Sequence, residues 1–134
     1  MDTPILLAIV EMGGYPDFTS LYRRAGYRPE KVHSMRKAQA WLKKQRPDVV
    51  VTEFHFDPEL RDRMSNLESL LAGLQRFAPE AKVIVFIEKR HRTRLEKVRT
   101  GYAVRAALDY PIDESSLEML LDRIAEEDGS CCGK

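Results

Sequence analysis

The chain has 134 residues, of which 43% are hydrophobic and 32% are charged, and its formal net charge is +1. This size and composition predict one globular domain and exclude a largely disordered chain. The near-neutral charge does not favour nucleic-acid binding through overall charge, and no apolar run approaches the length that spans a bilayer.

Five short apolar segments predict β-strands. The first follows a start without basic residues, so it is typical of a strand rather than a signal peptide, and we expect a cytoplasmic protein. Three of the segments are nearly continuous in apolar residues, as in strands that are covered on both faces. The segment at 28–33 has the weakest pattern. The predicted strands are residues 5–10, 28–33, 48–51, 83–87 and 106–108.

Amphipathic segments between these strands predict five helices. Ser34 is expected to cap the second helix, the capping-box pattern Ser65–Glu68 to open the third, and Asp113 or Ser115 to open the fifth. The apolar faces, in chain order, are Phe18, Leu21 and Tyr22; Ala38, Trp41 and Leu42; Leu67, Leu70, Leu71 and Leu74; Leu95, Val98 and Tyr102; and Leu117, Leu120, Leu121 and Ile124.

The alternation of strands and helices predicts an α/β fold, in which a doubly wound parallel sheet carries helices on both faces. We expect one domain over residues 1–128 and a flexible tail over 129–134. The two cysteines, Cys131 and Cys132, are adjacent in that tail. They imply no disulfide framework and supply too few ligands for a zinc site.

Three segments together resemble the receiver domains of response regulators. These are Ala25–Tyr27, the run from Arg46 through Asp48 into the third strand, and Asp109–Asp113, and the similarity covers roughly residues 4 to 127. The resemblance implies a flavodoxin-like, five-stranded parallel sheet of order 2-1-3-4-5. It also implies a stand-alone module of bacterial two-component signalling and its phosphorelays.

In that family's register, most of the phosphotransfer residues are replaced. Glu53 stands at the phosphoacceptor aspartate, and Glu11 is the acid retained where the family pairs acids for Mg²⁺. Ile87 replaces a hydroxyl residue, Tyr110 replaces the active-site lysine, and Ala107 replaces an aromatic switch residue. Acyl-phosphate formation needs a well-placed carboxylate, Mg²⁺ and a fixed cation. We therefore interpret Glu11, Glu53, Ile87 and Tyr110 as a vestigial phosphorylation pocket without catalytic residues.

Glu53 allows two interpretations. It could be a permanent partial mimic of the phosphorylated aspartate, or a solvated carboxylate in a disused pocket, and the sequence favours the second. Glu11, Glu53 and His55 are also candidate ligands for a divalent metal, so weak Mg²⁺ binding is the only cofactor considered. The loop at 56–64 could cover this pocket or be a tolerated insertion.

Two charged segments suggest a protein-binding surface. Residues 88–105 carry a net charge of +5, and residues 112–128 carry −6. A basic fourth helix beside an acidic fifth helix could be self-complementary, and the resemblance implies pairing through the fourth helix, fifth strand and fifth helix. Two solvated faces of opposite sign are the alternative. The candidate contact residues are Arg90, Arg94, Lys97, Arg99, Tyr102, Glu118 and Asp122.

No motif for a nucleophile with a base, and no phosphate-binding loop, is present in the sequence, so we do not expect an enzyme. The favoured function is an atypical receiver domain that works by phosphorylation-independent binding of a protein partner, such as a kinase, a regulator or an output protein. The alternatives are a receiver that still accepts phosphate on an acid of the pocket, and a sensor of a small ligand or divalent metal.

Overall fold

A computed structural model describes residues 4–10, 17–54, 62–89, 93, 96, 104–110 and 112–132. From β1 to β4, strands and helices alternate along these residues, as the sequence predicts. In chain order the elements are β1 (Ile5–Ile9), α1 (Thr19–Arg24), β2 (Arg28–Val32), α2 (Met35–Leu42), β3 (Val49–Phe54), α3 (Asp62–Phe77), β4 (Lys82–Ile87), β5 (Ala106–Asp109) and α5 (Glu114–Cys132).

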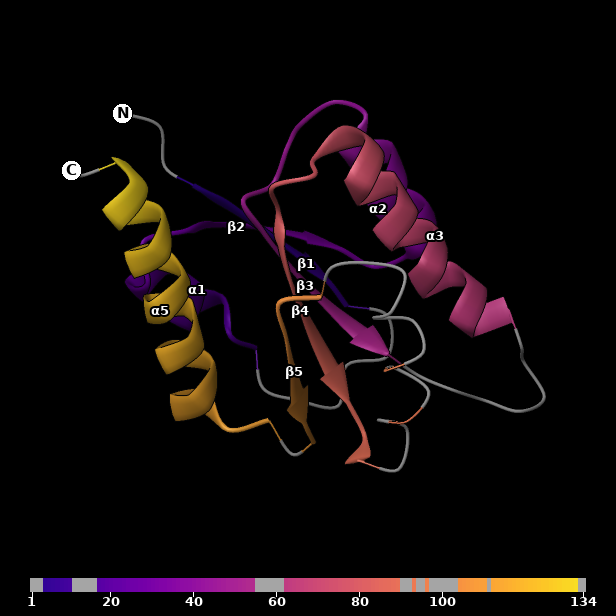
Figure 1. The fold of residues 1–134 in the computed structure, drawn as a ribbon. Helices are drawn as coiled ribbons and strands as arrows, with labels where there is room; N and C mark the ends of the chain where they lie inside the picture. The colour runs from indigo at the N-terminus through magenta and orange to yellow at the C-terminus, as the bar shows by residue number, and fades with distance from the viewer. Residues whose placement is uncertain are drawn as a thin grey trace.

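The five strands form one parallel sheet of order β2-β1-β3-β4-β5, which confirms the predicted topology. Helices α2 and α3 cover one face of this sheet, and α1 and α5 cover the other (Figure 1). Because all five strands are parallel, their carboxyl ends lie along a common edge of the sheet. In doubly wound folds this edge is where ligands bind.

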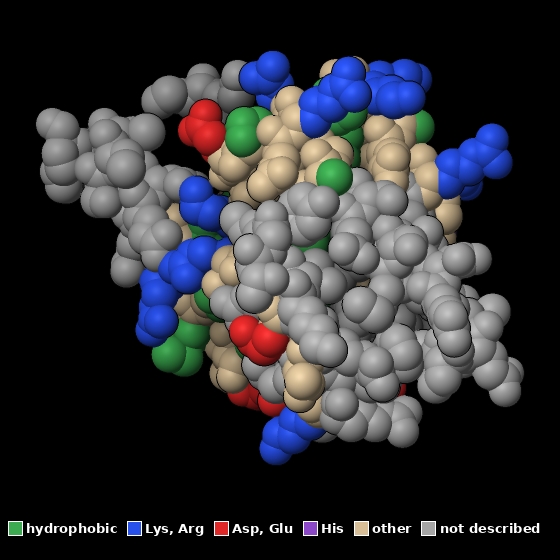
Figure 2. Space-filling model, turned by 45° about the vertical axis from the view of Figure 1, so that its right-hand side comes forward, with side chains coloured by type: hydrophobic (Ala, Val, Ile, Leu, Met, Phe, Trp, Pro, Cys, Tyr) green, Lys and Arg blue, Asp and Glu red, His purple; other side chains and the backbone are tan. Residues whose placement is uncertain are grey.

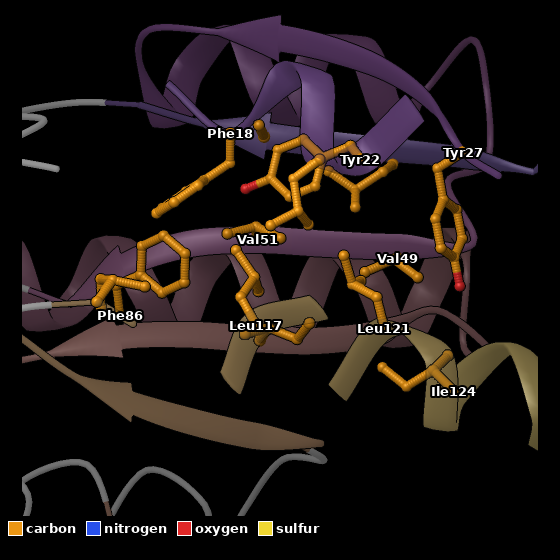
Figure 3. Close-up of a cluster of buried hydrophobic side chains, with 14 residues drawn as sticks. Phe18, Tyr22, Tyr27, Val49, Val51, Phe86, Leu117, Leu121 and Ile124 are labelled. Atoms are coloured by element: carbon orange, nitrogen blue, oxygen red, sulfur yellow. The ribbon is translucent and has the colours of Figure 1, made fainter. Parts of the chain in front are cut away.

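Each face of the sheet has its own hydrophobic core. On the α1/α5 face, Phe86 packs edge-on against Phe18 at a centroid distance of 6.2 Å, and the aromatic side chains lie against branched aliphatic ones from β3 and α5 (Figure 3). Such complete burial contributes roughly 1.5–3 kcal/mol per large side chain. The core of the α2/α3 face consists mainly of Leu7, Ile9, Ala38, Leu42, Val50, Leu70, Leu71, Leu74, Val83, Val85 and Ile87.

Two of the predicted helix starts are confirmed by their hydrogen bonds. The Ser34 hydroxyl accepts a hydrogen bond from the Lys37 N–H at 3.1 Å, so Ser34 caps α2. At α5, the Asp113 carboxylate accepts from the Ser116 N–H at 3.2 Å and from the Ser116 hydroxyl at 2.8 Å. Asp113, rather than Ser115, is therefore the residue that caps α5.

The predicted start of the third helix is wrong. Helix α3 begins at Asp62, so Ser65 lies inside it and does not cap it, and residues 62–64 belong to the helix rather than to the predicted 56–64 loop. Arg63 and Met64 favour helix, which allows the helix to begin about one turn earlier. At the other end of the chain, α5 continues to Cys132, past the expected boundary at residue 128. The flexible tail stays a prediction.

Strand β2 forms one edge of the sheet. The Arg28 N–H donates to the Pro4 carbonyl at 2.8 Å, and the Val32 carbonyl accepts from the Val10 N–H at 2.9 Å. Because backbone groups alternate in direction along a parallel strand, Pro29 and Lys31 point theirs away from β1. The weakest predicted strand is thus present and lies at an edge, where a strongly apolar sequence is not required.

Residues 95, 98 and 102, on which the prediction of a fourth helix rests, lie outside the described residues, as do 56–61 of the predicted loop. In the parts of the chain that are described, none of the helices combines the length and the apolar character needed to cross a membrane.

Candidate functional site

Strand β3 places two polar residues near the carboxyl edge of the sheet. Thr52 and Glu53 are the only buried polar or charged side chains among the described residues, at 0% and 2% exposure. Side chains alternate along a strand. Because Val49 and Val51 pack on the α1/α5 face and Val50 packs on the α2/α3 face, Glu53 lies on the first face and Thr52 on the second.

The expectation that Glu53 is a solvated carboxylate is therefore wrong. Strand β3 does not end at Val51 but continues to Phe54, and Glu53 is in register with Phe86 of β4. The carboxylate consequently begins from a backbone position inside the sheet, next to the aromatic part of the α1/α5 core. Burial of a carboxylate costs free energy unless hydrogen bonds or opposite charges compensate it. The fold therefore depends on the groups that surround Glu53.

Tyr110 is the residue that shares this environment with Glu53. It follows β5, its N–H donates to the Ile87 carbonyl at 3.0 Å, and its half-buried ring packs against the α1/α5 core. Burial raises the pKa of the Tyr110 hydroxyl well above its ordinary range, and the nearby carboxylates of Glu53 and Glu88 raise this pKa further. Tyr110 is therefore a neutral phenol at physiological pH and supplies no positive charge.

The other predicted pocket residues are arranged differently. Ile87 ends β4 with its side chain fully buried in the α2/α3 core, on the face of the sheet opposite to Glu53 and Tyr110. Ala107 lies in β5 and packs partly against the same core as Ile87. Glu11 lies outside the described residues. Of the four predicted pocket residues, the structure thus brings Glu53 and Tyr110 together.

The predicted metal set remains a prediction, because Glu11 and His55 are not among the described residues. Within the residues that are described, no group of three or more His, Cys, Asp or Glu side chains is arranged to hold a metal ion. Glu53 and Glu88 both act on Tyr110, since the negative charge of each raises the pKa of its hydroxyl.

The predicted partner surface is described only on its acidic side. On α5, Asp122 is exposed, and Glu118 is partly buried and pairs with Arg24 of α1 at 3.8 Å. Met119 is 63% exposed and is the one exposed large hydrophobic residue among those described. The other predicted contact residues, which are the basic Arg90, Arg94, Lys97 and Arg99 together with Tyr102, lie outside the described residues.

Sequence reasoning missed Thr52 and Glu88. Thr52 directly follows the apolar run Val49–Val51, and because threonine is β-branched it favours continuation of the strand. Glu88 is the first residue after β4, at the same edge of the sheet as Glu53. Its effect on Tyr110 depends on how β4 and β5 pair, which the sequence does not reveal.

Comparison with known proteins identifies the fold. No protein-family model and no curated protein matches the chain. A signal receiver domain of an HD domain-containing protein from Pseudomonas fluorescens Pf-5 superposes with a TM-score of 0.74 at 16% identity, over 96% of this chain and 99% of that one.

Two further solved structures agree. Chemotaxis protein CheY4 of Vibrio cholerae gives a TM-score of 0.70 at 15% identity, covering 92% of this chain and 99% of its own. The receiver domain of sensor histidine kinase PA1611 from Pseudomonas aeruginosa PAO1, which has a magnesium ion in its active-site cleft, gives 0.66 at 16% identity with coverages of 92% and 99%. The chain therefore has the flavodoxin-like fold of response-regulator receiver domains.

Proposed function

We propose that this chain is an atypical receiver-like signalling domain that acts by binding a protein partner and does not depend on phosphorylation. The observation that carries the proposal is the burial of Glu53, at 2% exposure, beside a neutral Tyr110. A phosphoryl donor needs access to the accepting carboxylate, and the transferred group needs positive charge around it. A buried glutamate does not meet the first requirement, and a phenol in the place of the lysine does not contribute to the second.

The wider environment of Glu53 supports the same reading. Glu88 adds a second negative charge near Tyr110, which would oppose the arrival of a phosphoryl group. Ile87 offers only hydrocarbon, and that hydrocarbon is directed into the opposite core. The module would therefore keep one electrostatic state at this edge, and its output would depend on which partner is present.

The first experiment asks whether the domain accepts phosphate. The protein is incubated with acetyl phosphate and Mg²⁺, and an ordinary receiver domain is treated in parallel as a positive control. The intact mass of both proteins is then measured by mass spectrometry. We expect no modification of this chain, whereas a phosphorylated protein gains about 80 Da per phosphoryl group. A stoichiometric adduct on this chain would refute phosphorylation independence.

The second experiment asks whether the charge on Glu53 matters for binding. Glu53→Gln keeps the size of the side chain and removes its charge. If the carboxylate is a permanent mimic of phosphorylation, this variant weakens partner binding or dimerisation while the circular dichroism spectrum and the unfolding transition stay those of a folded domain. Unchanged binding would show that Glu53 has a structural role only.

The partner surface we propose is the side formed by the fourth helix, β5 and α5, with a second copy of the chain as one occupant. On α5, exposed Asp122 adjoins exposed Met119, which gives an acidic site with an apolar contact. Exposed ion pairs contribute about 0.2–1 kcal/mol each, and a twofold axis repeats every pair.

Sedimentation across a salt series tests this pairing. We expect a dimer that dissociates as salt rises and is lost in Arg94→Glu, with partial recovery in the double variant Arg94→Glu/Asp122→Lys. Arg36→Glu, an exposed position on α2 across the sheet, is the control and should leave the dimer intact. A monomer at low salt, or a dimer indifferent to Arg94→Glu, would contradict the proposed interface.

A further inference from the structure

A second charged surface lies at the opposite end of the sheet from Glu53. Where α2 and α3 end, a hollow of about 350 Å³ is lined by Leu42, Lys43, Lys44, Gln45, Arg46, Arg76 and Phe77, and is called the basic hollow here. Figure 2 shows several Lys and Arg side chains gathered at this end of the molecule, with hydrophobic atoms between them.

The sequence places an unusual excess of basic residues around the basic hollow. Residues 31–47 contain six Lys or Arg and no Asp or Glu, although the whole chain has a net charge of only +1. The four cations that line the hollow are exposed. Among the described residues, none of these four forms an ion pair with an acid. The adjacent Asp48 carboxylate instead accepts a hydrogen bond from the Ile5 N–H at 2.8 Å.

At one carbonyl near each helix end, hydrogen-bond capping does not require these cations. Lysine and arginine often stabilise the last carbonyls of a helix. Here the Trp41 carbonyl already accepts hydrogen bonds from the N–H groups of Lys44 and Gln45, both at 3.0 Å, and the Leu74 carbonyl accepts from Ala78 at 2.7 Å. Backbone donors thus satisfy these carbonyls, and the charged ends of the side chains remain available to an external anion.

The floor of the basic hollow indicates what kind of anion fits. Leu42 is buried, so the partly exposed Phe77 supplies what apolar surface the hollow has, and the rest of its exposed lining is mainly polar. The Arg76 guanidinium lies over the Phe77 ring at 5.4 Å from its centroid. That ring face is consequently covered, which does not favour the stacking of a nucleic-acid base on it. Exposed, flexible cations also differ from the fixed and buried polar groups of a small-ligand pocket.

From these observations we infer that the basic hollow docks an acidic segment of a partner protein, one that carries an apolar side chain among its carboxylates. Complementary charge would steer the segment to the hollow, and the apolar side chain would contact the exposed part of Phe77. This surface is separate from the α5 side proposed above and does not involve Glu53, so either proposal can fail without the other.

Fluorescence anisotropy with a defined probe tests the inference. The probe is a fluorescein-labelled peptide of glutamates with a leucine at every fourth position, compared with a glutamine version and with a single-stranded oligodeoxynucleotide of equal charge. Two double variants carry the same change in charge. Lys43→Glu/Lys44→Glu alters the hollow, and Arg36→Glu/Lys37→Glu alters exposed positions in the first turn of α2.

At about 0.15 M salt, we expect the hollow variant to weaken binding of the acidic peptide at least about tenfold and the control variant less than about threefold, because Arg36 and Lys37 do not line the hollow and exposed charges at a distance are screened. The glutamine peptide should not bind. Equal losses in both variants, or no binding of the acidic peptide at low salt, would overturn the inference. Tighter binding of the oligonucleotide through the same hollow would assign it to nucleic acid. Loss of self-association in the hollow variant alone would assign it to a second copy of the chain.

Discussion

Replacing Thr52 with valine should stabilise this domain. The Thr52 side chain has no exposed surface, and its hydroxyl has no hydrogen-bond partner among the described residues. Its neighbours on the α2/α3 face, Val50, Val85 and Ile87, are aliphatic. A buried hydroxyl without a partner costs about 1–3 kcal/mol, and valine has the same shape with a methyl group in its place. We expect Thr52→Val to raise the free energy of unfolding by about 1–2 kcal/mol.

Urea denaturation measures this change. The midpoint should increase while the m-value stays constant, because the surface exposed on unfolding hardly changes. Thr52→Ser is the matched control: it keeps the hydroxyl and removes a methyl group, so it should lower the free energy of unfolding by about 1 kcal/mol. If Thr52→Val is instead destabilised by a similar amount, the hydroxyl has a partner, such as a buried water, and the reasoning fails.

Three further predictions concern local structure. Ser34→Ala removes the cap of α2 and should lower the free energy of unfolding by about 0.5–2 kcal/mol, whereas Ser34→Asp should retain it, both by urea denaturation. Gly26 has a φ of +96°, so Gly26→Ala should lower the free energy of unfolding by about 1 kcal/mol or more. The cost comes from the backbone, because no atom lies within 4 Å of the added Cβ. An unchanged thermal midpoint would contradict this. Hydrogen bonds from Thr19, and then from Lys31, lower the pKa of Asp17 to about 2 from an ordinary 3.8. The resulting stabilisation is present above pH 3.8 and is lost as the pH falls towards 2. Asp17→Asn should therefore reduce the dependence of the free energy of unfolding on pH between these values. An identical dependence in the variant would refute the prediction.

The strands could be predicted because their signals are local and repeated, whereas the order of the strands in the sheet was implied by the resemblance to receiver domains. Buried parallel strands require continuous apolar runs, and the runs at β1, β3 and β4 have them. The helix cap at Ser34 could also be predicted from the sequence, since capping involves residues that are three apart in the chain. The start of α3 was not, because Ser65 and Glu68 form a capping-box pattern that is equally compatible with the interior of a helix.

The candidate site could be predicted only in part. The resemblance placed Glu53 and Tyr110 at the same edge of the sheet, and the structure brings them together. Their burial was not predictable, because it depends on β3 continuing beyond Val51 and on the packing of the aromatic core around Phe86. The basic hollow was missed for a related reason: Lys43 and Arg76 are far apart in sequence, and only the packing of α2 on α3 makes them neighbours.

The direction of the backbone groups in β2 limits how this domain can aggregate or recruit partners. Of the two residues whose backbone faces away from the sheet, Pro29 has no N–H, so Lys31 supplies the single outward donor on this strand, beside its charged side chain. An incoming extended peptide therefore finds one backbone donor fewer than a regular edge strand offers, and edge-to-edge polymerisation from this side is disfavoured. Partners on the β2 side must rely more on side chains, which makes their recognition more selective for sequence than for an extended backbone.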